Sequence, residues 1–184
     1  MAKLYFRYGT VNSAKTLNLL AVAHNYQQQE KLVIIAKPKI DDRFGATKIK
    51  SRTGLEKEAD ILIEYGTPLN IPYADCILID EAQFLHPSVV DRLHDLAKTR
   101  DIPVICYGLR TDFRRTLFEG SMRLLELADS IEEIKTTCTY CNRKAVFNLK
   151  LSDGVPTLLG PSIELGAEEK YLPVCANCYT KRLG

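Results

Sequence analysis

The chain has 184 residues, of which 46% are hydrophobic and 26% are charged, with 25 basic against 23 acidic side chains. This composition excludes disordered and fibrous proteins, and a net charge of +2 gives no sign of a nucleic-acid or membrane-surface protein. At this length, folding buries roughly 70% of the unfolded chain's surface, which is enough for one domain and a small appendage. No apolar run reaches the roughly 18 residues of a membrane helix, and the N-terminus does not resemble a secretion signal, so we expect a cytoplasmic protein.

The first part of the chain alternates predicted strands and helices. Leu4 to Tyr8 is a short apolar and aromatic run that ends at Gly9, and residues 15–26 carry apolar side chains at helical spacing. The polar and basic segment 46–52 has little periodicity and is predicted to be a mobile loop. This alternation predicts an α/β fold with a mostly parallel sheet flanked by helices. Further predicted strands are 32–36, 61–65, 76–79 and 103–109, and further predicted helices are 87–99 and 117–128.

The segment between the first strand and the first helix resembles a phosphate-binding loop. The pattern is glycine, four residues, then glycine, lysine and serine or threonine. Such a loop surrounds phosphate with backbone N–H groups at a helix N-terminus, its lysine reaches the outer phosphates, and its hydroxyl holds magnesium. The fold would then be of the P-loop NTPase type. The predicted ATP-binding residues are Gly9, Thr10, Val11, Asn12, Ser13, Ala14, Lys15 and Thr16.

Ala14 departs from this pattern because it stands where the second glycine is expected. The position opens the first helix, and alanine is comfortable at helical backbone angles. We therefore expect the cost of Ala14 to be steric, through crowding of the phosphates by its methyl group, rather than conformational. The alternative for the whole motif is a surface turn with an incidental Lys-Thr pair.

An acidic pair directly follows the predicted strand at 76–79. Such a strand delivers carboxylates to the carboxyl edge of the sheet, where the phosphate loop also lies. We predict that Asp80 orients the magnesium shell and that Glu81 accepts a proton from the group that attacks the γ-phosphate. The alternative is a solvated acidic pair at a strand end.

Four of the six cysteines form two C-x-x-C knuckles, Cys138 with Cys141 and Cys175 with Cys178, separated by the 33 residues 142–174. Disulfides are rare in a reducing compartment, so the spacing needs another explanation. Four thiolates in paired knuckles provide the closed tetrahedral shell of a structural zinc ion. Free thiols and a redox pair are the alternatives.

The sequence pattern changes near residue 136. Short β-like runs follow, including 145–151, and residues 153–161 are rich in turn residues. We therefore predict a P-loop nucleotide-binding α/β domain at 1–136 and a small zinc-binding β domain at 137–184. The remaining cysteines, Cys76 and Cys106, lie inside apolar strands and are predicted to be core residues.

Taken together and in this order, the motifs resemble the cytosolic type II thymidine kinase family over nearly the whole chain. Asp-Glu-x-Gln-Phe at 80–84 and Gly-Leu-x-x-Asp-Phe at 108–113 are the specific signatures, and shorter matches lie at 41–45, 117–118 and Tyr171. The resemblance implies ATP-dependent phosphorylation of the 5′-hydroxyl of thymidine to thymidine monophosphate, in deoxynucleoside salvage. It also implies a homotetramer.

The resemblance assigns roles to particular residues. Glu81 would be the general base for the sugar hydroxyl, and Asp80 and Asp41 would serve the magnesium ion. A lasso-like loop at 162–171 would hold the base with backbone groups. Apolar and aromatic walls suit a nucleobase. The implied nucleoside-binding residues are Phe84, Leu109, Phe113, Phe118 and Tyr171, the last closing over the nucleoside.

One apolar position and four arginines carry further expectations. Val11 stands where relatives carry methionine near the thymine methyl, so we expect base selectivity to shift by ~1–3 kcal/mol, the value of one methylene. Arg43 and Arg110 are predicted to contact phosphate or sugar, with solvation or a salt bridge as the alternative. Arg114 and Arg115 are interpreted as a solvated pair.

Two other functions use part of this machinery. A P-loop ATPase or GTPase with a structural zinc domain would share the loop and the acidic pair, but it needs neither a lasso nor an aromatic pocket. A zinc-knuckle binding module would need a basic stripe near the knuckles, and acidic residues at 164, 168 and 169 offset the basic ones there. We therefore expect ATP and thymidine as partners and neither nucleic acid nor membrane.

Overall fold

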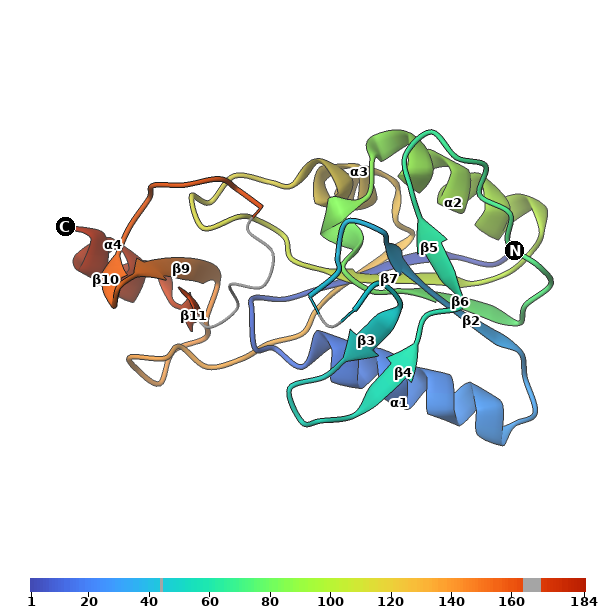
Figure 1. The fold of residues 1–184 in the computed structure, drawn as a ribbon, viewed down its shortest axis with the longest axis horizontal. Helices are drawn as coiled ribbons and strands as arrows, with labels where there is room; N and C mark the ends of the chain where they lie inside the picture. Colours follow the sequence, from blue (N-terminus) through green and yellow to red (C-terminus); the bar gives the residue numbers. More distant parts are fainter. Residues whose placement is uncertain (44, 164–169) are drawn as a thin grey trace.

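The computed structural model describes residues 1–43, 45–163 and 170–184. An α/β body contains the N-terminal three quarters of the chain, and a smaller three-stranded sheet with helix α4 lies at one end of it (Figure 1). In the described part of the chain, no helix is both long and apolar enough to span a membrane.

The main sheet has six strands in the order β5-β2-β6-β7-β1-β8, and each neighbouring pair runs parallel, as predicted. The edge strand β8 was not predicted because its sequence, Ser-Ile-Glu-Glu, is polar and partly exposed. Its register with β1 pairs Tyr5 with Ser130. The strands are β1 (Leu4–Tyr8), β2 (Val33–Pro38), β5 (Ile61–Ile63), β6 (Cys76–Ile79), β7 (Val104–Gly108) and β8 (Ser130–Glu133).

Helices cover both faces of this sheet: α1 (Lys15–Gln28) lies on one side, and α2 (Pro87–Thr99) and α3 (Glu119–Leu127) lie on the other (Figure 1). A hydrophobic core lies on each face of the sheet, and side chains of β6 alternate between them. Cys76 and Leu78 pack in the core next to α1, called the α1 cluster, whereas Ile77 and Ile79 pack against α2. The buried positions of Cys76 and Cys106 confirm that both are core residues. A short 3-10 helix, η1 (Ala82–Phe84), follows β6.

The predicted loop at 46–52 is wrong, because this segment contributes to a β-hairpin. Strand β3 (Lys48–Lys50) pairs antiparallel with β4 (Glu56–Glu58), and Lys48 forms an ion pair with Glu56 at 3.3 Å. Ile49 is only 2% exposed and packs in the α1 cluster. One apolar anchor between two lysines is too weak a pattern to reveal a strand, although the opposite charges of 48–50 and 56–58 fit the pairing.

The C-terminal segment forms an antiparallel sheet in the order β10-β9-β11, followed by α4. Strand β10 lies inside the segment predicted to be only a turn. Helix α4 was not predicted because the cysteines at its start, Cys175 at the N-cap and Cys178 in the first turn, were interpreted solely as ligands. Residues 164–169, which make up most of the expected lasso, lie outside the described residues. The elements are β9 (Phe147–Ser152), β10 (Val155–Pro156), β11 (Tyr171–Val174) and α4 (Ala176–Leu183).

Arg114 and Arg115 are exposed, as predicted for a solvated pair, and both also contact the C-terminal segment. The Arg114 guanidinium donates to the carbonyl of Leu158 at 3.1 Å and to the hydroxyl of Ser162 at 3.1 Å. Arg115 lies 4.9 Å from the ring centroid of Tyr179. These partners are more than forty positions away in the sequence, so no local pattern indicates them.

The backbone of the phosphate loop overturns the expectation for Ala14. Ala14 has φ 62° and ψ 30°, and Asn12 also has φ 62°, so both lie in the left-handed region. An L-residue with a Cβ pays about 1–2 kcal/mol there, whereas glycine does not. The cost of Ala14 is therefore conformational, because the loop turns left-handed immediately before α1 begins.

We predict that Ala14→Gly stabilises the protein by about 1 kcal/mol, which raises Tm by roughly 2–4 °C for a chain of this size. Thermal unfolding measures the effect. The matched control is Ala21→Gly, at an exposed position inside α1, which should lower stability by about 1 kcal/mol. Destabilisation by both substitutions would contradict the left-handed assignment of Ala14.

Candidate functional site

A cavity of about 300 Å³ opens at the carboxyl edge of the main sheet. Four strands end next to the cavity. Strand β1 leads into the phosphate loop, β2 is followed by Asp41, β6 by Asp80 and β7 by Leu109. Open parallel sheets bind ligands at this edge. The hairpin residues 48–53 and parts of the C-terminal segment form the other walls.

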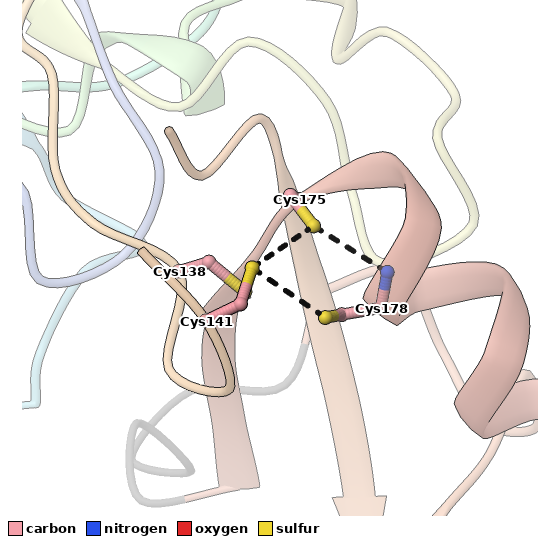
Figure 2. A group of neighbouring side chains, drawn as sticks. All are labelled: Cys138, Cys141, Cys175 and Cys178. Atoms are coloured by element: carbon pink, nitrogen blue, oxygen red, sulfur yellow. Dashed lines mark hydrogen bonds between the residues drawn. The ribbon is translucent and has the colours of Figure 1, made fainter. Parts of the chain in front are cut away.

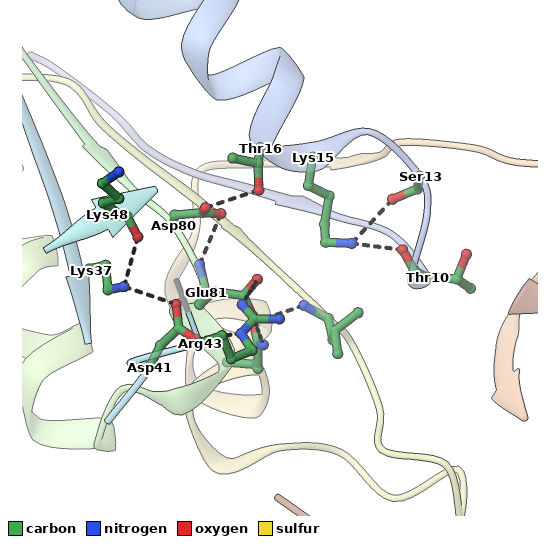
Figure 3. A network of polar contacts seen from close by, with 12 residues as sticks. Thr10, Ser13, Lys15, Thr16, Lys37, Asp41, Arg43, Lys48, Asp80 and Glu81 are labelled. Carbon is green, nitrogen blue, oxygen red and sulfur yellow. Dashed lines mark hydrogen bonds and ion pairs between the residues drawn. The ribbon is translucent and has the colours of Figure 1, made fainter. Parts of the chain in front are cut away.

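The phosphate loop depends on a glycine at its start. A Cβ on Gly9 would lie 2.3 Å from Ser13 Oγ and 2.6 Å from the carbonyl oxygen of Ile134, so only glycine fits. Lys15 Nζ closes the loop by donating to Thr10 O at 2.7 Å and to Ser13 Oγ at 3.3 Å (Figure 3).

Most of the predicted phosphate-binding residues line the cavity. Residues 11–16 do so, whereas Gly9 and Thr10 are not among the described residues that line the cavity. The Thr10 hydroxyl is buried and has no hydrogen-bond partner within the described ranges. Gly9 and Thr10 therefore shape the loop from behind.

Thr16 and Asp80 meet at the start of α1. The Thr16 hydroxyl donates to Asp80 Oδ2 at 3.0 Å, and the backbone N–H of Glu81 donates to Asp80 Oδ1 at 3.1 Å (Figure 3). Burial, and then the negative charge of Glu81, raises the pKa of Asp80 well above its ordinary value. A hydroxyl and a carboxylate beside a phosphate loop form an oxygen donor set that fits magnesium.

Asp41 lies in a chain of ion pairs rather than next to Thr16. Lys37 Nζ, with a fully buried side chain, lies 3.2 Å from Asp41 Oδ2 and donates to the carbonyl of Lys48 at 2.9 Å. Arg43 Nε lies 2.5 Å from Asp41 Oδ1, and Arg43 Nη2 lies 2.7 Å from Glu81 Oε1 (Figure 3). Arg43 lines the cavity, and these two ion pairs join it to carboxylates.

Glu81 occupies a left-handed backbone conformation, with φ 51°, at the end of β6. Gln83 Nε2 donates to Glu81 Oε2, and Gln83 Oε1 accepts from the N–H of Leu109 at 3.0 Å. A Cβ on Gly108 would lie 2.7 Å from Gln83 Oε1 and 3.0 Å from Gln83 N, so glycine leaves room for the Gln83 amide in this position. Gln83 was identified only as part of the Asp-Glu-x-Gln-Phe signature, and its contact with Glu81 was not predicted.

The five predicted nucleoside-binding residues lie together on the apolar part of the cavity wall. Phe84 and Phe118 pack edge to face with ring centroids 5.8 Å apart, and Phe113 lies 6.1 Å from Tyr171. Leu109 completes the set. Segments from three regions of the chain therefore contribute aromatic side chains to one cavity. Ser162 and Ile163, from the start of the predicted lasso, also line the cavity. Further wall residues had no role predicted from the sequence, namely Leu17, 48–53, Asp112 and Asn148.

Arg110 does not line this cavity in the described part of the structure. Its guanidinium lies 5.7 Å from the ring centroid of Tyr8 and donates to the carbonyl of Val146 at 3.5 Å. Arg110 thus joins β1 to the segment before β9, which favours the structural alternative over a contact with phosphate or sugar.

The four knuckle cysteines gather around one point in the C-terminal segment (Figure 2). Their sulfur atoms all lie within 4.8 Å of one another, and Cys141 Sγ lies 3.6 Å from Cys175 Sγ and 3.8 Å from Cys178 Sγ. Tetrahedral zinc with Zn–S bonds of about 2.3 Å places sulfurs about 3.8 Å apart. The backbone N–H of Tyr140 also donates to Cys138 Sγ at 3.4 Å, which suits a thiolate. The cluster therefore fits zinc.

Comparison with known proteins gives a consistent result. The family model for thymidine kinase matches residues 2–179. A thymidine kinase from Lactiplantibacillus plantarum is 46% identical over 97% of this chain and 96% of the relative, and one from Streptococcus gordonii is 47% identical over 98% and 97%. A third, from Chromobacterium violaceum, is 45% identical over 97% and 98%. The chain belongs to the thymidine kinase family.

Proposed function

We propose that this protein transfers the γ-phosphoryl group of ATP to the 5′-hydroxyl of thymidine, giving thymidine monophosphate in cytoplasmic deoxynucleoside salvage. One observation carries the proposal: a phosphate loop, an acidic cluster and an aromatic wall line a single cavity. The names of the relatives support the same substrate. A hydrolase would need the loop and the acidic cluster, but the aromatic wall would then have no use.

The two substrates would occupy opposite ends of the cavity. Triphosphate would lie against residues 11–16, where backbone N–H groups and the N-terminus of α1 favour anions. Thymine would lie among Phe84, Phe113, Phe118 and Tyr171, whose rings offer apolar area without competing hydrogen bonds. The sugar hydroxyl would then lie between them, beside Glu81.

Glu81 is the proposed general base. Its carboxylate receives Gln83 on one oxygen and Arg43 on the other, so its orientation is fixed before substrate binds. As the 5′-oxygen bonds to the γ-phosphorus, the bond from that phosphorus to the bridging oxygen of ADP breaks, and the hydroxyl proton moves to Glu81. The left-handed backbone of Glu81 is the kind of strain that collects at active sites.

Lys15, Thr16 and the acidic residues would handle the charge of the phosphates. Thr16 and Asp80 would hold magnesium, and Asp41 would complete its surroundings. A magnesium ion held by these residues would neutralise the charge that develops on the phosphate oxygens. Lys15 would exchange its contacts with Thr10 and Ser13 for the outer phosphates, which are stronger acceptors.

Hairpin residues 48–53 and Ser162 and Ile163 would cover the cavity and limit access of water, which otherwise competes with the sugar hydroxyl. A lasso formed by 162–171 is part of the proposal. The division into domains at 136/137 is also part of the proposal, and a separate hydrophobic core around Leu149, Val174 and Tyr179 supports it. A homotetramer is proposed on family resemblance alone.

We predict that Glu81→Gln lowers turnover of thymidine by roughly 10²-fold or more, because the amide cannot accept the proton. ATP binding should change little, since Glu81 lies beyond the phosphate loop. Steady-state kinetics and calorimetric ATP binding measure the two effects. Glu126→Gln, an exposed change on α3, is the matched control and should leave both unchanged. Near-normal turnover of Glu81→Gln would remove Glu81 as the base.

We predict that Cys178→Ala removes the bound zinc and lowers Tm, because three thiolates no longer close a tetrahedral shell. Metal analysis should give one zinc per chain for the unaltered protein and much less for the variant. Cys106→Ala, which removes a buried thiol of the main sheet, should keep its zinc. Equal zinc content in all three proteins would exclude the four-cysteine site.

A further inference from the structure

Asn148 connects the C-terminal segment to the phosphate loop. It lies on β9, is 4% exposed and lines the cavity. Its Oδ1 accepts from the backbone N–H of Val11 at 2.9 Å, and its Nδ2 donates to the carbonyl of Thr111 at 3.2 Å. A single buried amide thus joins the phosphate loop, the segment after β7 and β9.

The position of Asn148 is set by the strands next to the cysteine knuckles. Asn148 pairs with Pro173 on β11, two residues before Cys175. The carbonyl of Pro173 accepts from the N–H and from the hydroxyl of Thr139, each at 2.9 Å, and Thr139 lies inside the first knuckle. Both knuckles therefore flank the strand pair that directs Asn148 at the loop.

The phosphate loop needs such a contact because its backbone is strained. Val11 immediately precedes Asn12, and both Asn12 and Ala14 hold left-handed angles. Left-handed backbone angles are unfavourable for residues with a Cβ, and they persist only where surrounding contacts fix them. The contact at Val11 N–H lies at the start of this strained stretch, and the contacts of Lys15 lie at its end.

We propose that Asn148 is a positioning residue that holds the phosphate loop in its nucleotide-binding shape and makes that shape depend on the cysteine-knuckle segment. The inference rests on the proposed function in one respect, namely that the loop binds ATP. Loss of Asn148 lets the strained residues relax, and the nucleotide must then restore their conformation on binding. Nucleotide affinity falls as a result.

The test is ATP affinity of the full zinc-loaded chain, measured by calorimetry with magnesium ATP alone. Asn148→Leu removes both hydrogen bonds at similar volume and should weaken ATP binding roughly tenfold, the effect of leaving a buried N–H unpaired. The matched control is Tyr179→Phe, which removes a different bond between the same parts, from Tyr179 to the carbonyl of Phe113 at 2.5 Å. It should lower Tm and leave ATP affinity unchanged.

A double-mutant cycle with Ala14→Gly separates positioning from general stabilisation. Glycine removes part of the strain, so Asn148→Leu should weaken ATP binding only about twofold to threefold in that background, since coupled residues give non-additive effects. Equal effects of Asn148→Leu in both backgrounds would overturn the proposal. If the leucine variant does not fold, Asn148→Ala replaces it in the same cycle.

The outcomes distinguish the proposed function from the positioning role of Asn148. Absence of ATP binding by the unaltered chain would contradict the proposed function. ATP binding that is unchanged by Asn148→Leu, in a protein that otherwise binds ATP well, would overturn the positioning role alone. Weaker ATP binding by Tyr179→Phe of the same size would also overturn it, because any loosened contact between the two parts would then have the same effect.

Discussion

Buried charge at the carboxyl edge of the main sheet is the constraint on which the rest of the site depends. Asp41, Asp80 and Glu81 are brought there by the ends of β2 and β6, and burying an unpaired charge costs several kcal/mol. Lys37 and Arg43 compensate them from the same edge. Burial and the neighbouring charge of Glu81 raise the pKa of Asp80, so a bound cation would stabilise its charged form.

Backbone strain at this edge has the same logic. Asn12, Ala14 and Glu81 all lie in the left-handed region, and each is next to a side-chain contact that fixes it. Gln83 and Arg43 hold Glu81, and Asn148 and Lys15 bracket the loop. Side chains of neighbouring elements, including a strand of the C-terminal segment, thus contact both the phosphate loop and the proposed base.

Much of this could be predicted where the signal is local. The bounds of β1, β6 and α2 follow from apolar runs and from Pro87, and the aromatic wall follows from family signatures. The hairpin at 48–58 was not predicted because Ile49 is its only buried hydrophobic residue. The contacts of Arg114 were not predicted because its partners are 44 and 48 positions away in the sequence. Those of Asn148 were not predicted because its partners are 37 and 137 positions away. The conformation of Ala14 escaped because alanine normally indicates helix.

The most direct measurement is transfer of labelled γ-phosphate from magnesium ATP by the zinc-loaded protein, with and without thymidine. The account predicts labelled thymidine monophosphate, and little release of free phosphate when thymidine is absent, because the aromatic wall is a nucleoside site and the cavity restricts water. Free phosphate released at the same rate with or without thymidine would contradict it, since Glu81 would then activate water rather than the sugar hydroxyl.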